Sequence, residues 1–396
     1  MWQQLKNIYH LSRAFFTCVA YGFPAHGMTV IGVTGTDGKT TTASLLYHIL
    51  RQDGKSAALI STVGAVIGEK EYGTGFHVTT PDSRLIQSYI KKAKDFGVTH
   101  LVLEVTSHAL DQHRTFGIPF AVGVITNITH EHLDYHKTYS RYLYAKSRLV
   151  QRSLVGVINK DDSSYEQLVH LLQNKKILTF GMKNADVTKD TIKDFKSHLI
   201  GEYNTYNILA ASAVAMHLGV TPQVVKAAVG SFRLPKGRTE VVYSDGFTVM
   251  IDFAHTPNAF ENLLSTLKKS RNKGRLIHVF GAAGLRDGAK RPVMGEIASR
   301  YDDVIVLTAE DPRSENVRKI SQEIEKGIIR LRDFPEVTMI DDRQKAIEYA
   351  ISLAANDDIV VITGKGHEES MNFGQGEVLW SDHEAVNRVL ATRYEK

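Results

Sequence analysis

Short apolar runs alternate with longer amphipathic stretches along this chain, and this alternation constrains the fold more than any other feature. The runs are rich in Val, Ile and Leu and end in polar residues, as buried parallel strands do. We expect the clearest strands at 28–34, 99–106, 120–128, 154–159, 247–253, 275–280, 304–308 and 359–363. Strands that alternate with helices favour an α/β fold, with mostly parallel sheets covered by helices on both faces.

A glycine-rich loop follows the first strand and precedes a predicted helix, 40–52. Glycines let backbone N–H groups approach phosphate oxygens, and the helix N-terminus adds positive potential. The lysine of the loop can reach the outer phosphates, and the next hydroxyl can bind magnesium. Only two residues separate the glycines, so a simple turn before a helix is the alternative. The loop consists of Gly35, Thr36, Asp37, Gly38, Lys39, Thr40 and Thr41.

The α/β pattern restarts after a segment, 233–237, that Pro235 and Gly237 punctuate. The 396 residues suffice for two or three domains, and 43% hydrophobic residues can form sizeable cores. We therefore predict a short segment 1–27, a central phosphate-loop ATPase domain 28–234, and a Rossmann-like C-terminal domain 235–396.

Composition narrows the classes of partner. Lys and Arg number 48 against 43 acids, and this mild excess suits small anionic substrates rather than nucleic acid. The single cysteine, Cys18, allows no disulfide within the chain and fits a reducing cytosol. No uninterrupted apolar run reaches the roughly 18 residues of a membrane span, so we expect a soluble cytoplasmic protein.

Several charged residues stand at or after strand ends. Glu104 ends an apolar strand, where a buried charge is costly unless it is bound; magnesium on a phosphate or a structural salt bridge would serve. The His-rich segment 127–136 lacks cysteine ligands and the H-E-x-x-H spacing of zinc sites. Lys146, on the helix that follows, is unremarkable by itself.

In this order and spacing, the loop 35–41, Glu104, the segment 126–136 and Lys146 resemble the Mur ligase family. The resemblance implies an ATP-dependent ligase that forms an amide bond through an acyl phosphate. It implies that Lys39, Glu104, His132, Lys146 and Arg238 are catalytic. It also implies that Mg²⁺ is held by Thr40, Glu104, His132 and a carbamylated Lys146.

Further stretches resemble the nucleotide site of the family. Asn204 and Asn207 match the asparagines near the adenine, although an asparagine that caps a helix is a compatible interpretation. Arg238 matches a phosphate-binding arginine. Asp252 and His255 match the ribose stretch, in which Phe253 replaces the usual tyrosine.

The remaining motifs resemble the branch of the family that adds the third residue of the peptidoglycan stem peptide. Residues that match its muramyl-peptide site are Thr79, Thr80, Thr106, Gln112 and Arg114, where Thr106 replaces a more usual serine. Residues that match its amino-acid site are Arg286, Asp311, Arg313, Gly364 and Glu368. Arg313 suggests an amino acid with a distal carboxylate, because a guanidinium binds a carboxylate bidentately, and the resemblance implies that this amino acid is meso-diaminopimelate.

The beginning of the chain departs from the family pattern. Residues 1–27 are too few for the N-terminal domain that holds the UDP part of the substrate. We expect a partner that supplies UDP binding, or an acceptor without UDP such as a folate or polyglutamate chain. A non-catalytic ATP-binding subunit is a third interpretation, which the intact Lys39, Glu104, His132 and Lys146 disfavour. Residues 1–27 are expected to form an amphipathic helix packed on the body or on a partner.

Overall fold

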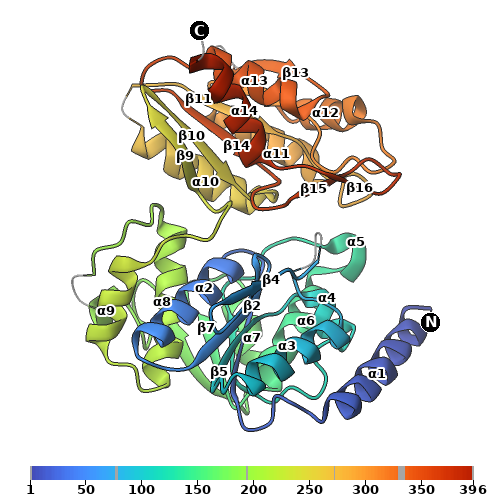
Figure 1. The fold of residues 1–396 in the computed structure, drawn as a ribbon, viewed down its shortest axis with the longest axis vertical. Helices are drawn as coiled ribbons and strands as arrows, with labels where there is room; N and C mark the ends of the chain where they lie inside the picture. The colour runs from blue at the N-terminus through green and yellow to red at the C-terminus, as the bar shows by residue number, and fades with distance from the viewer. Residues whose placement is uncertain (1, 76–78, 193–194, 272, 329–334, 395–396) are drawn as a thin grey trace. The chain divides into compact units, whose positions relative to one another are not determined.

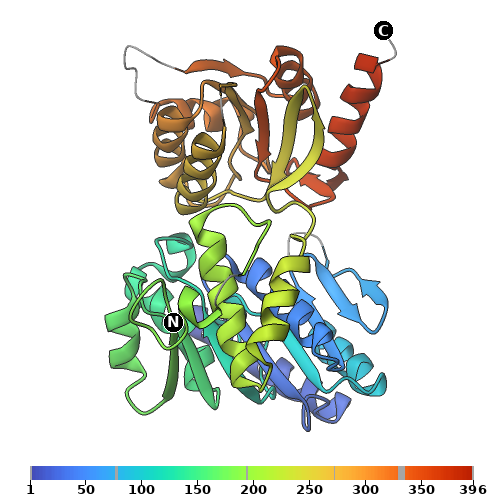
Figure 2. The same cartoon turned by 90° about the vertical axis from the view of Figure 1, so that its left-hand side faces the viewer.

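The computed structural model describes residues 2–75, 79–192, 195–271, 273–328 and 335–394. It divides into two compact units, Met1–Arg233 (unit 1) and Leu234–Lys396 (unit 2). Each unit has a central, mostly parallel sheet with helices on both faces, which confirms the predicted α/β class (Figure 1, Figure 2).

Unit 1 is built on an eight-stranded sheet in the order β4-β3-β2-β5-β1-β6-β7-β8, in which β3 is antiparallel to both of its neighbours, β2 and β4. The predicted strand 99–106 ends at Glu104, because Thr106 already caps the next helix. The strands are β1 (Thr29–Thr34), β2 (Ala57–Ser61), β3 (Gly64–Ile67), β4 (Lys70–Tyr72), β5 (His100–Glu104), β6 (Phe120–Ile125), β7 (Val155–Asn159) and β8 (Lys176–Phe180).

The helices of unit 1 cover both faces of this sheet. Helices α2, α8 and α9 pack together on one face, and α3, α4, α6 and α7 lie on the other (Figure 1). They are α1 (Trp2–Tyr21), α2 (Lys39–Gln52), α3 (Ser83–Asp95), α4 (Ser107–Asp111), α5 (Leu133–His136), α6 (Tyr139–Gln151), α7 (Tyr165–Leu171), α8 (Glu202–His217) and α9 (Pro222–Ser231), with a 3₁₀ turn at Lys189–Ile192.

The N-terminal residues form the expected helix, and α1 packs on α3. Ala14 and Cys18 are fully buried on its inner face, and Arg13 pairs with Asp82 at 3.1 Å. None of the helices in the described ranges is both long enough and apolar enough to cross a membrane.

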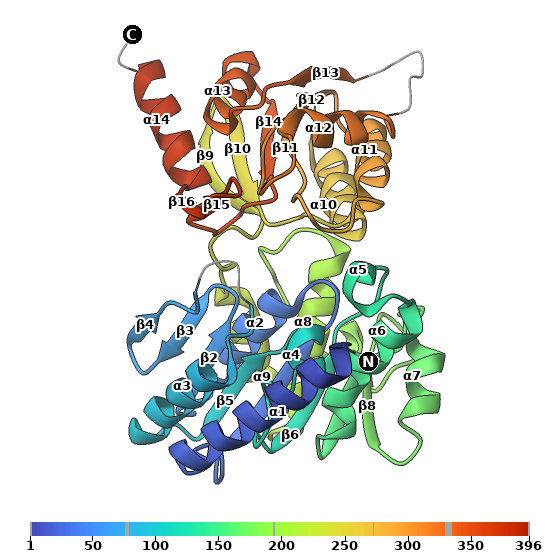
Figure 3. The same cartoon turned by 90° about the vertical axis from the view of Figure 1, so that its right-hand side faces the viewer.

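Unit 2 has a six-stranded sheet in the order β13-β12-β11-β14-β10-β9, in which β9 is antiparallel to β10. Helices α10, α11 and α12 pack on one face, and α13 and α14 pack on the other (Figure 3). The strands are β9 (Glu240–Asp245), β10 (Phe247–Asp252), β11 (Leu276–Phe280), β12 (Val304–Leu307), β13 (Glu336–Met339) and β14 (Ile359–Thr363), with a small hairpin of β15 (Ser370–Asn372) and β16 (Glu377–Leu379). The helices are α10 (Pro257–Ser270), α11 (Lys290–Tyr301), α12 (Val317–Glu325), α13 (Arg343–Leu353) and α14 (Asp382–Tyr394).

Candidate functional site

The glycine-rich loop of unit 1 connects the carboxyl end of β1 to the N-terminus of α2. Gly38 caps the helix in a left-handed conformation, with φ of 78°. The residues after β6 hold the loop from one side. The backbone N–H of Asp37 donates to Oδ1 of Asn127 at 2.9 Å, and Oγ1 of Thr126 donates to the carbonyl of Asp37 at 2.7 Å. The loop is therefore organised by its own sheet, with a helix N-terminus behind it, as an anion site requires.

Thr40 and Glu104 meet at the start of α2. Oγ1 of Thr40 lies 3.1 Å from both carboxylate oxygens of Glu104. Thr62, which follows β2, donates to Oε2 of Glu104 from its backbone N–H and from its hydroxyl, each at 2.9 Å. Glu104 is 1% exposed, and these partners are hydroxyls and an amide, not the cation of a salt bridge. Sequence analysis missed Thr62, because it belongs to a turn without a motif.

Lys146 on α6 reaches back to the same loop. Its side chain is buried, Nζ donates to the carbonyl of Gly35 at 2.5 Å, and Nζ lies 4.5 Å from the centre of the Tyr142 ring. Burial, and then the charge of Lys39, hold the pKa of Lys146 well below its usual range. Lys39 itself donates to the carbonyl of Thr36 at 2.8 Å. No motif identifies Tyr142, whose hydroxyl lies 3.2 Å from Oγ1 of Thr36.

The predicted magnesium ligands can be tested against the chemistry of these side chains. Thr40 and Glu104 offer oxygen atoms, which Mg²⁺ prefers. His132 has a left-handed backbone, with φ of 56°, and its ring packs 4.9 Å from that of His108. Within the described ranges, no three His, Cys, Asp or Glu side chains gather as a metal cage. The oxygen atoms of Thr40 and Glu104 fit a magnesium ion that would take other ligands from phosphate and water.

Glu131 is a further carboxylate of this region, and no role was predicted for it. Glu131, next to His132, is only 8% exposed. Burial raises the pKa of Tyr142, and the charge of Glu131 raises it further. Burial lowers the pKa of Lys146, and the charge of Glu131 opposes this larger effect. The signal that could have identified Glu131 is an acid in a loop that directly follows a buried strand.

The residues predicted to bind the muramyl peptide form one connected set. Oγ1 of Thr80 donates to the carbonyl of Glu104 at 3.1 Å and accepts from the N–H of Thr106 at 2.9 Å. Arg114 donates to the carbonyl of Thr80 at 2.7 Å and to Oε1 of Gln112 at 2.7 Å. Thr79 is half-buried beside Thr80. The set is tied through Glu104 to the phosphate loop, although its role in binding stays a prediction.

The two predicted adenine asparagines lie buried on α8. Nδ2 of Asn207 donates to Oδ1 of Asn204 at 3.1 Å, and Nδ2 of Asn204 donates to the carbonyl of Ile200 at 2.8 Å. Oδ1 of Asn207 accepts from Oγ1 of Thr42, on α2, at 3.2 Å. The helix is capped by Gly201, so neither asparagine serves as its N-cap.

In unit 2, the predicted phosphate and ribose residues come together beside β10. Arg238 stacks on the Phe253 ring at 4.3 Å, and Asp252 accepts from the N–H groups of Thr239 and Ala254, each at 2.6 Å. Nδ1 of His255 lies 2.8 Å from the carbonyl of Phe253. Burial, and then the charge of Lys290, lower the pKa of His255 to about 3, so its ring is neutral at ordinary pH.

The predicted amino-acid residues follow β12 and β14, at the carboxyl edge of the sheet of unit 2. Nζ of Lys365 lies 3.0 Å from Oδ1 of Asp311 and 2.6 Å from Oε2 of Glu368, so one buried cation joins the two loops. Gly364 is needed because a β-carbon there would lie 2.7 Å from Oε2 of Glu310. No role was predicted for Lys365, although it stands between Gly364 and Gly366.

Two arginines complete this predicted site. Arg313 has a left-handed backbone, with φ of 51°, and its N–H donates to the carbonyl of Asn372 at 2.9 Å. Its guanidinium has no hydrogen bond or ion pair to any residue of the described ranges. Arg286, in the loop after β11, is exposed.

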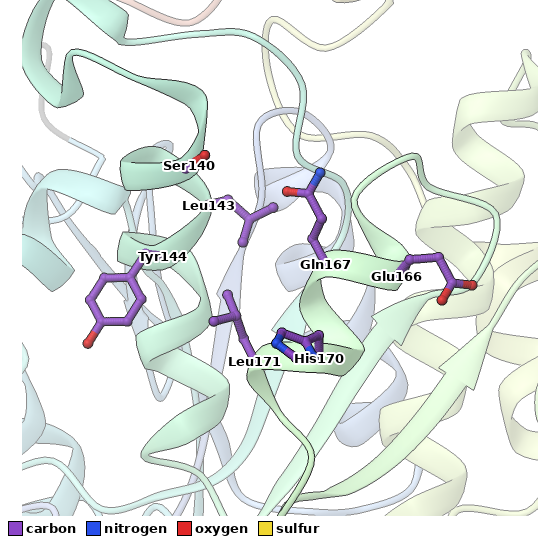
Figure 4. Close-up of a pocket in the computed structure, with 7 residues that line it drawn as sticks. All are labelled: Ser140, Leu143, Tyr144, Glu166, Gln167, His170 and Leu171. Atoms are coloured by element: carbon purple, nitrogen blue, oxygen red, sulfur yellow. The ribbon is translucent and has the colours of Figure 1, made fainter.

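An apolar hollow of about 530 Å³ lies elsewhere on unit 1, between α6 and α7 (Figure 4). Leu143 and Tyr144 line it from α6, and His170 and Leu171 from α7. It contains none of the predicted site residues, so the candidate site rests on the strand ends and not on this hollow.

Comparison with known proteins agrees with this arrangement. The Mur ligase middle domain family matches residues 33–215, and the family described as Mur ligase, glutamate ligase domain matches residues 237–366. The UDP-N-acetylmuramoyl-L-alanyl-D-glutamate--2,6-diaminopimelate ligase of Aquifex aeolicus is 39% identical over 388 residues, which cover 93% of this chain and 79% of the relative. The ligase of the same name from Geobacillus kaustophilus is 37% identical over 396 residues, with 93% and 80% covered.

Solved structures agree as well. A structure of a ligase of that name superposes with a TM-score of 0.64 at 28% identity, covering 99% of this chain and 84% of the other. Escherichia coli FolC in complex with DHPP and ADP superposes with a TM-score of 0.74 at 19% identity, covering 97% and 94%, which shows a shared fold alone. The chain therefore belongs to the Mur ligase family, and it is an ATP-dependent ligase that forms an amide bond.

Proposed function

We propose that this ligase joins meso-diaminopimelate to the D-glutamate of a muramyl dipeptide, the reaction for which its relatives are named. The observation that carries the proposal is the pair of loops after β12 and β14. Arg313 offers a guanidinium without a partner among the described residues, which suits a carboxylate. Asp311, from the same loop, and Glu368, from the other loop, both contact Lys365, and carboxylates suit an ammonium group. A diamino diacid carries both groups at its distal end.

The phosphate side of the reaction is assigned to unit 1. The N–H groups at the start of α2 and the amine of Lys39 would hold the ATP phosphates, and Thr40, Glu104 and His132 would hold magnesium. A magnesium ion there would supply positive charge against the transferred phosphoryl group. The carboxylate of the dipeptide attacks the γ-phosphate and becomes an acyl phosphate, while the bond to the β-phosphate breaks and ADP leaves. The amine of the amino acid then displaces phosphate.

Lys146 has a particular part in this proposal. Burial holds the pKa of its amine well below the usual range, which favours the neutral form, and a neutral amine can add carbon dioxide and lose a proton to form a carbamate. The carbamate is an anionic oxygen ligand that magnesium accepts, whereas an ammonium group would repel the metal. The buried position at Gly35, close to the charge of Lys39, would then contain opposite charges instead of like charges.

The test is phosphate release from ATP and Mg²⁺ by the purified chain, with product mass as the second readout. UDP-muramyl dipeptide is supplied with meso-diaminopimelate, with L-lysine, or with no amino acid. We expect release and a tripeptide product only with diaminopimelate. Product with lysine would refute the assigned amino acid. A parallel series uses a dipeptide acceptor that lacks UDP, to test whether the enzyme requires the UDP group. Product in that series alone would overturn the proposed substrate.

A further inference from the structure

Arg343 is a buried arginine that no motif of the sequence identified. It is the first residue of α13, is 2% exposed, and directs its guanidinium to the carboxyl edge of the unit 2 sheet. Nη1 donates to the carbonyl of Ala309 at 3.0 Å, and Nη2 donates to the carbonyl of Thr363 at 2.9 Å. Ala309 lies two residues after the end of β12, and Thr363 is the last residue of β14. In the sheet, β11 separates these two strands. One side chain therefore spans two strand ends that are not neighbours.

Asp382 holds this guanidinium from the opposite side. It is the first residue of α14 and is fully buried, and its two oxygens accept from Nε and Nη2 of Arg343 at 2.8 and 2.7 Å. Nε1 of Trp380 donates to Oδ1 of Asp382 at 2.9 Å. Burial opposes the charge of Arg343, but the attraction of Asp382 outweighs it and raises the pKa of the guanidinium. Arg343 therefore remains a cation with one defined orientation.

The two carbonyls lie immediately before the residues assigned to the amino acid. Ala309 precedes the segment that carries Asp311 and Arg313, and Thr363 precedes the segment that carries Gly364 and Glu368. Lys365 joins the same segments a second time through its contact with Asp311, and it also contacts Glu368 within its own segment. The separation of the two loops is thus set by Arg343 where the loops begin and by Lys365 two residues further on.

We infer that Arg343, oriented by Asp382, is a positioning residue that sets the affinity of this ligase for its incoming amino acid. The inference rests on the proposed function, because it takes these loops to be the amino-acid site. Recognition of two charged groups at the end of one substrate requires their binding partners to be held within a fraction of an ångström. The planar fork of an arginine can bind two carbonyls and a carboxylate at once, whereas a lysine supplies a single nitrogen.

The experiment compares steady-state kinetics of the full chain with those of Arg343→Lys. The variant keeps a cation beside Asp382 but cannot span both carbonyls. We expect KM for the amino acid to rise about tenfold or more, while KM for ATP changes little. Trp380→Phe is a milder second variant, because it removes only one hydrogen bond to Asp382 and keeps the ion pair. It should raise the same KM by a smaller factor and leave KM for ATP unchanged.

Arg275→Lys is the matched control, since it alters an arginine–carboxylate pair at the opposite, amino edge of the same sheet. Arg275 donates to Asp358 at 2.8 Å and to the carbonyl of Leu353 at 2.6 Å. This variant should lower the melting temperature without changing KM for the amino acid. A purely structural role for Arg343 predicts the same behaviour for all three variants, with loss of stability and unchanged KM, and that result would overturn the inference.

Binding without turnover provides a second readout, the rise in melting temperature on addition of amino acid or of ADP. In Arg343→Lys we expect the amino-acid shift to shrink and the ADP shift to remain. If the wild-type chain gives neither turnover nor a shift with any amino acid, the proposed function fails. If the wild type responds and both Arg343→Lys and Trp380→Phe respond equally well, only the positioning inference fails.

Discussion

Oδ1 of Asn207 occupies the place that a β-carbon on Gly38 would take. A β-carbon built on Gly38 would lie 2.1 Å from this oxygen, well inside contact distance. The asparagine on α8 thus packs directly against the phosphate loop, and it also accepts from Thr42 at 3.2 Å. The contacts of Asn207 with Gly38 and Thr42 therefore join α8 to the start of α2.

Gly38→Ala should therefore abolish ATP binding. The substitution strains a left-handed residue, by about 1–2 kcal/mol, and also displaces Asn207. Gly54→Ala is the control, because Gly54 has a similar φ of 76° but no atoms within 4 Å of its added β-carbon. Titration with a fluorescent ATP analogue checks this. Equal affinity for both variants would show that the close contact does not matter.

Thr62→Val should raise the Mg²⁺ concentration needed for half-maximal activity. The change removes the hydroxyl bond to Glu104 and keeps the backbone bond, so the carboxylate becomes less well oriented. A net hydrogen bond of about 1 kcal/mol corresponds to a several-fold change. Thr179→Val is the control, since Thr179 donates to Asp186 at 2.7 Å on the exposed edge strand β8. Matching Mg²⁺ curves for wild type and Thr62→Val would contradict the prediction.

Activity should depend on carbon dioxide, because burial lowers the pKa of Lys146 and so favours the neutral amine that forms a carbamate. Depletion of carbon dioxide in mildly acidic buffer should lower turnover, and added bicarbonate should restore it. Lys146→Met should be inactive under both conditions. Carbon-13 NMR with labelled bicarbonate gives a direct measurement. Full activity without carbon dioxide, together with no carbamate signal, would exclude the modification.

Arg313→Ala should raise KM for diaminopimelate by roughly 10–100-fold, since a charge-assisted bond contributes about 1.5–3 kcal/mol. KM for the muramyl dipeptide should stay near the wild-type value. Arg318→Ala is the control, because Arg318 is an exposed arginine of the next helix, 3.8 Å from Asp341. Competition between diaminopimelate and lysine provides the measurement. An unchanged preference in Arg313→Ala would mean that this guanidinium does not read the distal carboxylate.

The free energy of unfolding should fall in mild acid, because His136 is buried in its neutral form. Burial lowers the pKa of His136 to about 4, and Nε2 lies 3.0 Å from Oγ of Ser107. The unfolded chain takes up this proton near pH 6.5, so the folded state loses stability as pH falls from about 6.5 to 4. The loss is at most about 3 kcal/mol.

Urea unfolding at several pH values checks this linkage. His136→Gln should flatten the pH dependence between 6.5 and 4, because the glutamine does not titrate. His217→Gln, at the exposed C-terminal end of α8, should leave it unchanged. Equal slopes for His136→Gln and the wild type would assign the acid sensitivity to other groups.

Much of the fold could be predicted from the sequence, because its central strands are buried on both faces. Ile359–Thr363 was predicted to the residue, and β1 and β11 to within one residue of each end. β2 is fully buried inside the sheet and was not predicted, because Ala57–Ser61 contains a single β-branched residue. The other strands that were not predicted include β4, β9 and β13, which are short, polar or half-exposed edge strands. Their sequence pattern is weak, since only hydrogen bonds to a neighbouring strand make them strands.

The sequence by itself determined the family, the α/β class and the residues that stand at strand ends, because motifs and periodic burial are local properties. It could not show that Thr62 holds Glu104, that Asn207 packs on Gly38, or that Arg343 spans Ala309 and Thr363. Those contacts join segments far apart in the chain. Only the packing of helices and strands within each unit brings the segments into contact. The chemical groups are thus specified residue by residue, while their geometry is a property of the tertiary structure.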